Sequence, residues 1–152
     1  MSAVGAASLA PDDPLYSSLK DLTKEDLALL KWKMEWKDAA RSQQLAPTSD
    51  WLTWGCMAGR GWGKTRVGAN WLGLAAASDP GSFNGVIAPT RDDVRYVCFE
   101  GETGLFSYIP DCLVQDYNKS DLIIYLWNGA IIRGFGSERP ERLRGPQHHR
   151  VW

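Results

Sequence analysis

A glycine-rich segment at residues 58–65 constrains the fold of this chain more than any other feature of the sequence. It follows the apolar run WLTWGCM at 51–57, which has the length of a buried strand. It precedes residues 66–78, in which apolar side chains recur on one helical face. The order strand, glycine-rich loop, helix predicts an α/β fold whose loop binds phosphate at the start of the helix.

The segment AGRGWGKT at 58–65 fits the pattern of a phosphate-binding loop, with Ala58 in place of the usual first glycine. Its glycines let successive backbone N–H groups of residues 61–64 turn toward the β phosphate of ATP. Lys64 is placed to reach the β and γ phosphates, and the Thr65 hydroxyl is placed to bind Mg²⁺. The predicted nucleotide contacts are Ala58, Gly59, Arg60, Gly61, Trp62, Gly63, Lys64 and Thr65.

The glycines of this segment suggest two other interpretations. A dinucleotide-binding loop is excluded because Lys64 stands where the third glycine of that motif belongs. An ordinary glycine-rich turn remains the alternative to a phosphate-binding loop.

A helix is predicted upstream of this segment. Thr23 and Asp26 have the spacing of a capping box, so the helix should begin at about residue 24 and run to 41 or 42. Its tryptophans, Trp32 and Trp36, either pack on their own domain or contact a partner protein. The apolar residues form two rows, one of Leu27, Leu30 and Met34 and one of Leu29, Trp32, Trp36 and Ala40.

The segment after residue 78 repeats the alternation of strand and helix. Residues 84–89, NGVIAP, have the length of a buried strand and are flanked by turn residues. Thr90 and Asp93 form a second capping box, which predicts a helix over 91–100. The resulting order βαβα predicts a parallel sheet covered by helices.

A hairpin is predicted next, because Asn128 and Gly129 lie between the β-rich runs LIIYLW and AIIRGFG. One short helical turn at Pro140 should follow, with Gly145 as its stop. Residues 146–152 then lead into a further strand.

Composition excludes several classes of protein. No apolar run approaches the roughly 20 residues that a membrane-spanning helix needs, and the first residues lack the basic and apolar regions of a secretory signal. Cys56, Cys98 and Cys112 lack metal-binding spacing, so free thiols in a reducing cytosol are expected. These observations predict a soluble protein.

The net charge of −1 does not by itself indicate nucleic-acid binding. Residues 133–150, however, carry five arginines against Glu138 and Glu141, a local charge of +3 with neutral histidines. This segment either meets a negatively charged partner or forms a solvated face. The arginines are Arg133, Arg139, Arg142, Arg144 and Arg150.

The order of several separated stretches resembles the large terminases of tailed bacteriophages and gene transfer agents. The resemblance covers residues 36–152 and rests on ARSQQLAP, WLTWGCMAGRGWGKTRVGANW, VIAPTRDDVRYVCFEG, WNGAIIRGFGSE and PERLRGPQHHRVW. A phosphate-binding loop alone would suit helicases, kinases or transporters equally. The succession of all five stretches, with LRGPQ just before an apolar strand, is what points to terminases.

The resemblance implies a P-loop NTPase fold of the ASCE type, with a parallel central sheet flanked by helices. It also implies a motor subunit that hydrolyses ATP, with Mg²⁺, to move double-stranded DNA into a procapsid, and that cuts the DNA with a separate nuclease domain. The implied protein partners are other large-terminase subunits in a ring, the small terminase and the portal protein. The implied location is the cytoplasm of an infected or prophage-carrying bacterial host.

The resemblance also assigns roles to residues outside the lysine and threonine of the loop. Gln44, with Gln43 as a neighbouring candidate, matches the glutamine that senses adenine. Arg60 matches a basic loop residue that senses or neutralises the terminal phosphate. Arg144 matches an arginine that acts in trans on the nucleotide of a neighbouring subunit. Arg142 and Arg139 are the fallback candidates for that trans role. The alternative for the glutamines and Arg60 is a solvated position without function, and the alternative for the three trans candidates is a surface or DNA-facing arginine.

Three regions are expected: a flexible tail at 1–21, a helix and adenine-side segment at 22–46, and an ATPase core at 47–152. In the resembling family the last strand continues into paired acids that hold Mg²⁺ and polarise water, and here no acid follows Glu141. The core is therefore expected to be incomplete at its C-terminus, with the nuclease domain absent and the chain alone inactive in hydrolysis. The alternatives are another P-loop translocase or helicase, or a non-catalytic nucleotide-binding fragment.

Overall fold

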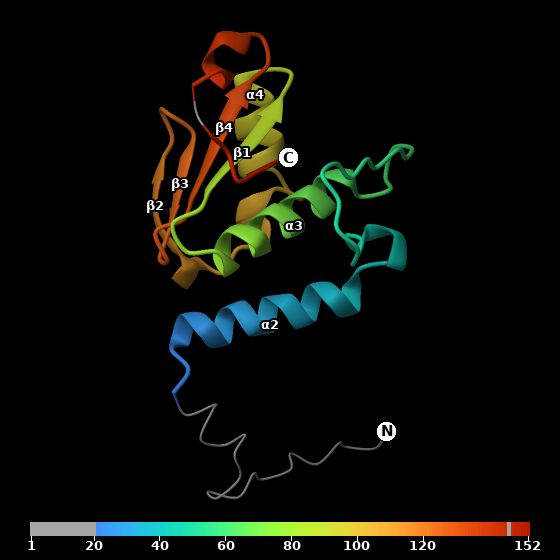
Figure 1. Cartoon of the computed structure of the whole chain (residues 1–152), viewed down its shortest axis with the longest axis vertical. Coiled ribbons are helices and arrows are strands. Elements are labelled where there is room, and N and C mark those ends of the chain that lie inside the picture. Colours follow the sequence, from blue (N-terminus) through green and yellow to red (C-terminus); the bar gives the residue numbers. More distant parts are fainter. Residues whose placement is uncertain (1–20, 146) are drawn as a thin grey trace, which may run out of the picture.

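The computed structural model of the chain describes residues 21–145 and 147–152. The predicted tail at 1–21 lies outside these residues except for Asp21. Figure 1 shows a sheet on one side of α3, with α2 on the other side of that helix. The helices and turns are α2 (Lys24–Ala39), η1 (Ser42–Gln44), α3 (Lys64–Ser78), α4 (Arg91–Asp93), η2 (Val94–Phe99), η3 (Leu105–Ser107), η4 (Asp111–Leu113) and η5 (Pro140–Leu143). The strands are β1 (Phe83–Ala88), β2 (Val114–Asn118), β3 (Ile123–Leu126), β4 (Ile131–Gly136) and β5 (Arg150–Val151).

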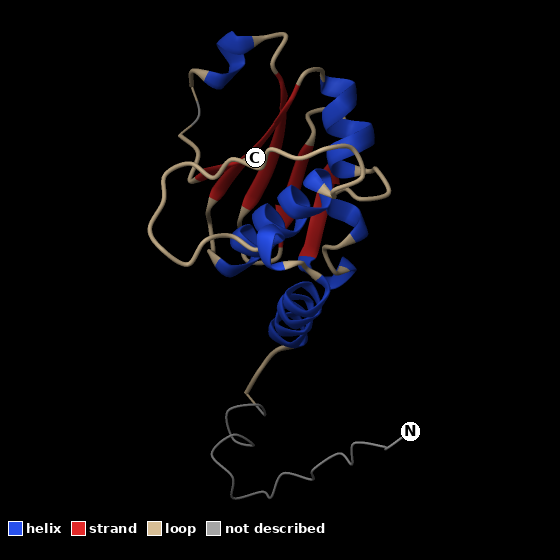
Figure 2. Ribbon diagram, turned by 90° about the vertical axis from the view of Figure 1, so that its right-hand side faces the viewer, coloured by secondary structure: helices blue, strands red, loops and turns tan. Residues whose placement is uncertain are grey.

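The sheet confirms an α/β protein but corrects the prediction of a parallel sheet. Its strand order is β2-β3-β4-β1-β5, with β1 parallel to β4 and to β5. β3 runs antiparallel to β4, and β2, which was not predicted, runs antiparallel to β3. The sheet is mixed because the predicted hairpin forms at Asn128-Gly129, where Gly129 has a φ of 78° that glycine adopts without strain. Figure 2 shows these strands with the helices packed around them.

The predicted strand at 51–57 is wrong. In the structure this segment is an irregular chain that joins no strand, and Leu52 and Met57 are 99% and 100% exposed. Trp51 instead packs its ring 5.7 Å from that of Trp71 on α3. A strand needs a partner edge for its backbone hydrogen bonds, and the sheet edge formed by β5 is only two residues long.

Both capping boxes form as predicted. Thr23 Oγ1 accepts a hydrogen bond of 3.1 Å from the Asp26 N–H, and α2 ends at Ala39, two or three residues before the predicted end at 41 or 42. Thr90 and Asp93 make the same exchange at α4. That helix continues without a break into the π-helical η2, so it ends at Phe99.

The two apolar rows of α2 have different surroundings. The row of Leu29, Trp32 and Trp36 is buried, and Trp32 Nε1 donates a hydrogen bond of 2.9 Å to Asn70 Oδ1 on α3. The other row, Leu27, Leu30 and Met34, is exposed. The tryptophans therefore pack on their own domain, as one of the two interpretations predicted.

Small residues on α3 allow tryptophans to approach its backbone. A Cβ added at Gly73 would lie 2.6 Å from the Trp32 ring, and one added at Gly68 would lie 1.9 Å from the Trp152 ring. Side chains at either glycine would displace these rings. Helix α3 is thereby held between α2 and the end of β5.

Aromatic and polar contacts fix β5 against β1. The His148 ring stacks on Phe83 at 4.9 Å and meets Phe135 edge-on at 5.2 Å. Burial, and next the charge of Arg133, lower the pKa of His148. Arg150 makes an ion pair of 2.8 Å with Asp79, at the end of α3.

None of the helices in the ranges 21–145 and 147–152 combines the length and apolar character that crossing a bilayer requires.

Candidate phosphate-binding site

The loop that precedes α3 has the backbone shape of an anion-binding loop. Gly61 and Gly63 have φ angles of 75° and 95°, a left-handed region that side chains other than glycine's rarely adopt. Gly63 is the N-cap of α3, and Lys64 is its first residue. A Cβ at Gly59 or Gly61 would meet no atom within 4 Å, so the loop is open at these positions. In Figure 1 the loop is the segment that leads into the N-terminal end of α3.

The ammonium of Lys64 lies over this loop. Its Nζ donates hydrogen bonds of 2.8 Å to the Ala58 carbonyl and 2.9 Å to the Gly59 carbonyl. A lysine has three N–H donors, so these two bonds leave one donor for another acceptor. The side chain is exposed and therefore accessible to a ligand.

The electrostatics of the loop suit an anion. The first backbone N–H groups of a helix have no partner within the helix and carry its partial positive charge. Residues 51–78 contain no aspartate or glutamate and contain Arg60, Lys64 and Arg66. Arg60 is exposed, and Thr65 is half-buried directly after the lysine. The residues present therefore fit a polyphosphate.

Gln44 lies against the loop, although the two are 18 residues apart in sequence. Its Nε2 donates a hydrogen bond of 2.9 Å to the Trp62 carbonyl, and its Oε1 accepts one of 3.0 Å from the Arg41 N–H. The side chain is only 4% exposed, whereas Gln43 is exposed. The structure thus brings together the predicted loop residues and Gln44, and it leaves the adenine role as a prediction.

Arg41 contacts the loop and was not predicted. Its Nη2 donates a hydrogen bond of 2.6 Å to the Trp62 carbonyl, and its guanidinium lies 5.5 Å from the centre of the Trp62 ring. The only sequence signal was its position three residues before Gln44, which does not by itself distinguish a loop contact from a solvated arginine.

The arginines proposed to act in trans lie elsewhere. Figure 1 shows η5 at one end of the sheet, apart from the loop that precedes α3. Arg144 is exposed and pairs with Glu141 at 3.1 Å. Arg139 is also exposed, and the side chain of Arg142 lies outside the described part of the structure. The chain therefore does not bring Arg139 or Arg144 to its own loop.

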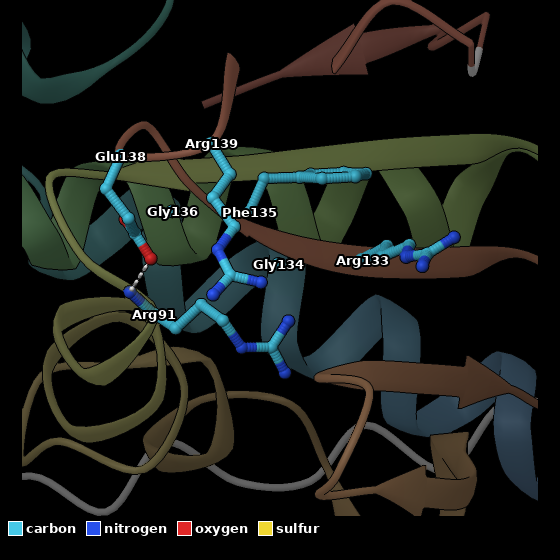
Figure 3. Close-up of a pocket in the computed structure, with 7 residues that line it drawn as sticks. All are labelled: Arg91, Arg133, Gly134, Phe135, Gly136, Glu138 and Arg139. Carbon is cyan, nitrogen blue, oxygen red and sulfur yellow. Dashed lines mark hydrogen bonds between the residues drawn. The ribbon is translucent and has the colours of Figure 1, made fainter. Parts of the chain in front are cut away.

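Arg139 belongs to a group of arginines near the end of β4 that the sequence did not reveal. Figure 3 shows Arg139, Arg91 and Arg133 around a small hollow, with Glu138 beside Arg91. Arg91 donates its backbone N–H to Glu138 Oε1 at 3.4 Å and its Nη2 to the Ser120 carbonyl at 2.6 Å. Arg133 was part of the arginine-rich segment, but Arg91 comes from α4, 42 residues earlier than Arg133.

A larger hollow lies beside the loop, between the 51–56 segment, α3 and β5. It has a volume of about 890 Å³, and four of its 14 lining residues are tryptophans. Lys64 is among its lining residues, so this hollow adjoins the glycine-rich loop. Its aromatic walls are Trp51, Trp54, Trp71 and Trp152.

Comparison with known proteins identifies one family. Residues 56–152 match the family described as "Terminase large subunit, T4likevirus-type, N-terminal". No curated protein and no solved structure matches significantly. The matched region includes the loop, α3 and the whole sheet.

Proposed function

The chain belongs to the family of large terminase subunits of the T4-like virus type, and on that premise we propose that it binds Mg²⁺-ATP at residues 58–65 as the nucleotide-binding part of a DNA-packaging motor. The observation that carries this proposal is the position of Lys64. Its ammonium lies over a glycine loop at the start of a 15-residue helix and retains a free donor. This arrangement supports polyphosphate binding.

Each loop residue has a chemical part in this proposal. The N–H groups of residues 61–64 would bind the β phosphate, and Lys64 would bridge the β and γ phosphates. Thr65, which follows Lys64 on α3, would supply its hydroxyl to Mg²⁺. Exposed Arg60 would offset the charge of the terminal phosphate. Mg²⁺ would shield the phosphate oxygens and hold their geometry.

Hydrolysis needs groups beyond this loop. Residues 51–78 contain no carboxylate that could orient an attacking water. We therefore propose that the loop supplies binding, and that turnover depends on acids from elsewhere in the motor. Arg144, with Arg139 and Arg142 as fallbacks, is proposed to complete the charge stabilisation on a neighbouring subunit's nucleotide. The motor would translocate double-stranded DNA within a ring that works with the small terminase and the portal.

The decisive test is ligand stabilisation. With Mg²⁺-ATP at about 100 times its Kd, the free energy of unfolding of the wild type should rise by about 2.7 kcal/mol. Lys64→Ala should unfold at the wild-type temperature without nucleotide and gain no stability with it, whereas Lys33→Ala, an exposed lysine on α2, should respond like the wild type. Thermal melts with and without Mg²⁺-ATP measure both. Equal protection of the wild type and Lys64→Ala would refute the assignment.

A further inference from the structure

The Trp62 carbonyl is bound twice from the segment just after α2. Arg41 donates to it from Nη2 at 2.6 Å, and Gln44 donates to it from Nε2 at 2.9 Å. The two donors are themselves connected, because the Arg41 N–H donates to Gln44 Oε1 at 3.0 Å. We call Arg41 and Gln44, with the carbonyl that they share, the carbonyl clamp.

The carbonyl clamp determines where the next N–H group points. A trans peptide places its C=O and N–H on opposite sides, and the described residues contain no cis peptide bond. Because the Trp62 C=O faces Arg41 and Gln44, the N–H of Gly63 points away from both side chains. The φ of 95° at Gly63 continues the chain from this peptide into α3.

We propose that Arg41 is a positioning residue for phosphate binding, which it serves by fixing the peptide between Trp62 and Gly63. This inference rests on the proposed function, since the Gly63 N–H is among the groups that would bind the β phosphate. A loop whose donors already point at the ligand does not have to be ordered when the ligand binds. Arg41 thereby acts on the phosphates without touching them.

Arg41 and Gln44 contribute differently to the clamp. Gln44 is 4% exposed, and a Cβ at Gly63 would lie 3.0 Å from its Nε2, so packing against the loop holds it in place. Arg41 is exposed, but its hydrogen bond is charge-assisted and its guanidinium also lies over the Trp62 ring. Removing Arg41 should therefore loosen the loop while Gln44 keeps the segment in place.

Calorimetric titration with Mg²⁺-tripolyphosphate measures the effect of Arg41 on phosphate binding alone, because tripolyphosphate has no base or sugar. Arg41→Met keeps the aliphatic packing and removes the donor, and it should weaken binding by about tenfold. Arg41→Lys restores a charged donor and should recover binding to within about threefold of the wild type. Lys37→Met, which removes an exposed charge from the last turn of α2, should bind as the wild type does.

A spectroscopic measurement separates positioning from general loss of structure. The amide resonance of Gly63 in a proton–nitrogen correlation spectrum should move in Arg41→Met, while resonances of β1 to β4 stay in place. If Arg41→Met does not fold, Arg41→Gln, which keeps a neutral donor, should show a loss of about threefold and the same shift in smaller degree.

The outcomes are distinct. Wild-type binding of tripolyphosphate together with unchanged affinity and an unmoved Gly63 resonance in Arg41→Met would overturn the role of Arg41 and leave the proposed function standing. Absence of binding of both Mg²⁺-ATP and tripolyphosphate by the wild type would overturn the proposed function and this inference together.

Discussion

Gly68 decides how closely α3 approaches the end of β5. In an exposed helical position, replacing glycine with alanine would stabilise the protein by about 1 kcal/mol. At Gly68, however, the new Cβ would lie 1.9 Å from the Trp152 ring. Gly68→Ala should therefore lower the free energy of unfolding by about 1–3 kcal/mol, measured by urea denaturation. Gly55→Ala is the control, since a Cβ there meets nothing within 4 Å; equal stability of the two variants would contradict the packing described here.

His148 should make the stability of the fold depend on pH. Burial and the Arg133 charge lower its folded pKa below the ordinary value of 6.5, so the unfolded chain binds the proton more readily. The free energy of unfolding should therefore fall as the pH drops below about 6.5, and the loss is complete below the folded pKa. Denaturation between about pH 7.5 and 5.5, where carboxylates stay ionised, measures this slope.

His148→Phe is the matched variant for that experiment, because a phenyl ring preserves the stacking on Phe83 and the edge-on contact with Phe135 but does not titrate. Its stability should change less over the same pH range. An identical slope in both proteins would assign the pH dependence to another group.

Single residues also show what a sequence conveys about a site. The left-handed glycines of the loop and the place of Lys64 at the start of α3 could be predicted, because a local pattern of eight residues specifies them. Their role in binding nucleotide stays a prediction. Arg41 could not be predicted, because its contact with Trp62 joins residues 21 apart and uses a backbone carbonyl that any residue provides. Gln44 was found only through resemblance.

At the scale of elements, the two rows of α2 give opposite expectations. Trp32→Ala would leave a cavity against α3 and would remove the donor to Asn70 Oδ1, while Asn70 Nδ2 keeps its bond to the Arg66 carbonyl. It should therefore lower the free energy of unfolding by about 3–5 kcal/mol. Met34→Ala, at a 66% exposed residue of the other row, should change the free energy of unfolding by no more than about 0.5 kcal/mol. Chemical denaturation of both variants tests this, and comparable losses would mean that the exposed row is covered in solution.

Element boundaries with local causes were predicted well. The capping boxes at Thr23 and Thr90 start helices because a side chain three residues ahead binds the backbone, which sequence spacing alone specifies. The Asn128-Gly129 turn is similarly local. The strand at 51–57 failed because strand formation needs a partner edge, and an apolar run does not say whether one is within reach.

At the scale of the whole molecule, the α/β class could be predicted but the sheet could not. The alternation of strands and helices in the first half implied parallel pairing, and β1 does pair in parallel with both neighbours. The second half adds a hairpin and β2, whose pairing depends on contacts between Val114–Asn118 and β3. The antiparallel pair of the hairpin was predicted, but the pairing of β2 joins residues that no single segment contains, so it could not be predicted.

Trp152 and Trp32 pack tightly against α3 at Gly68 and Gly73, so they hold the helix in place. The fifteen residues of α3 span about 22 Å, and Lys64 is at its N-terminal end. Trp32 of α2 and Trp152, which follows β5, pack against the helix along its length. A close-packed contact transmits displacement rather than absorbing it. A shift of α3 at Lys64 would therefore be felt at both tryptophan contacts, one with α2 and one with the residue that follows β5.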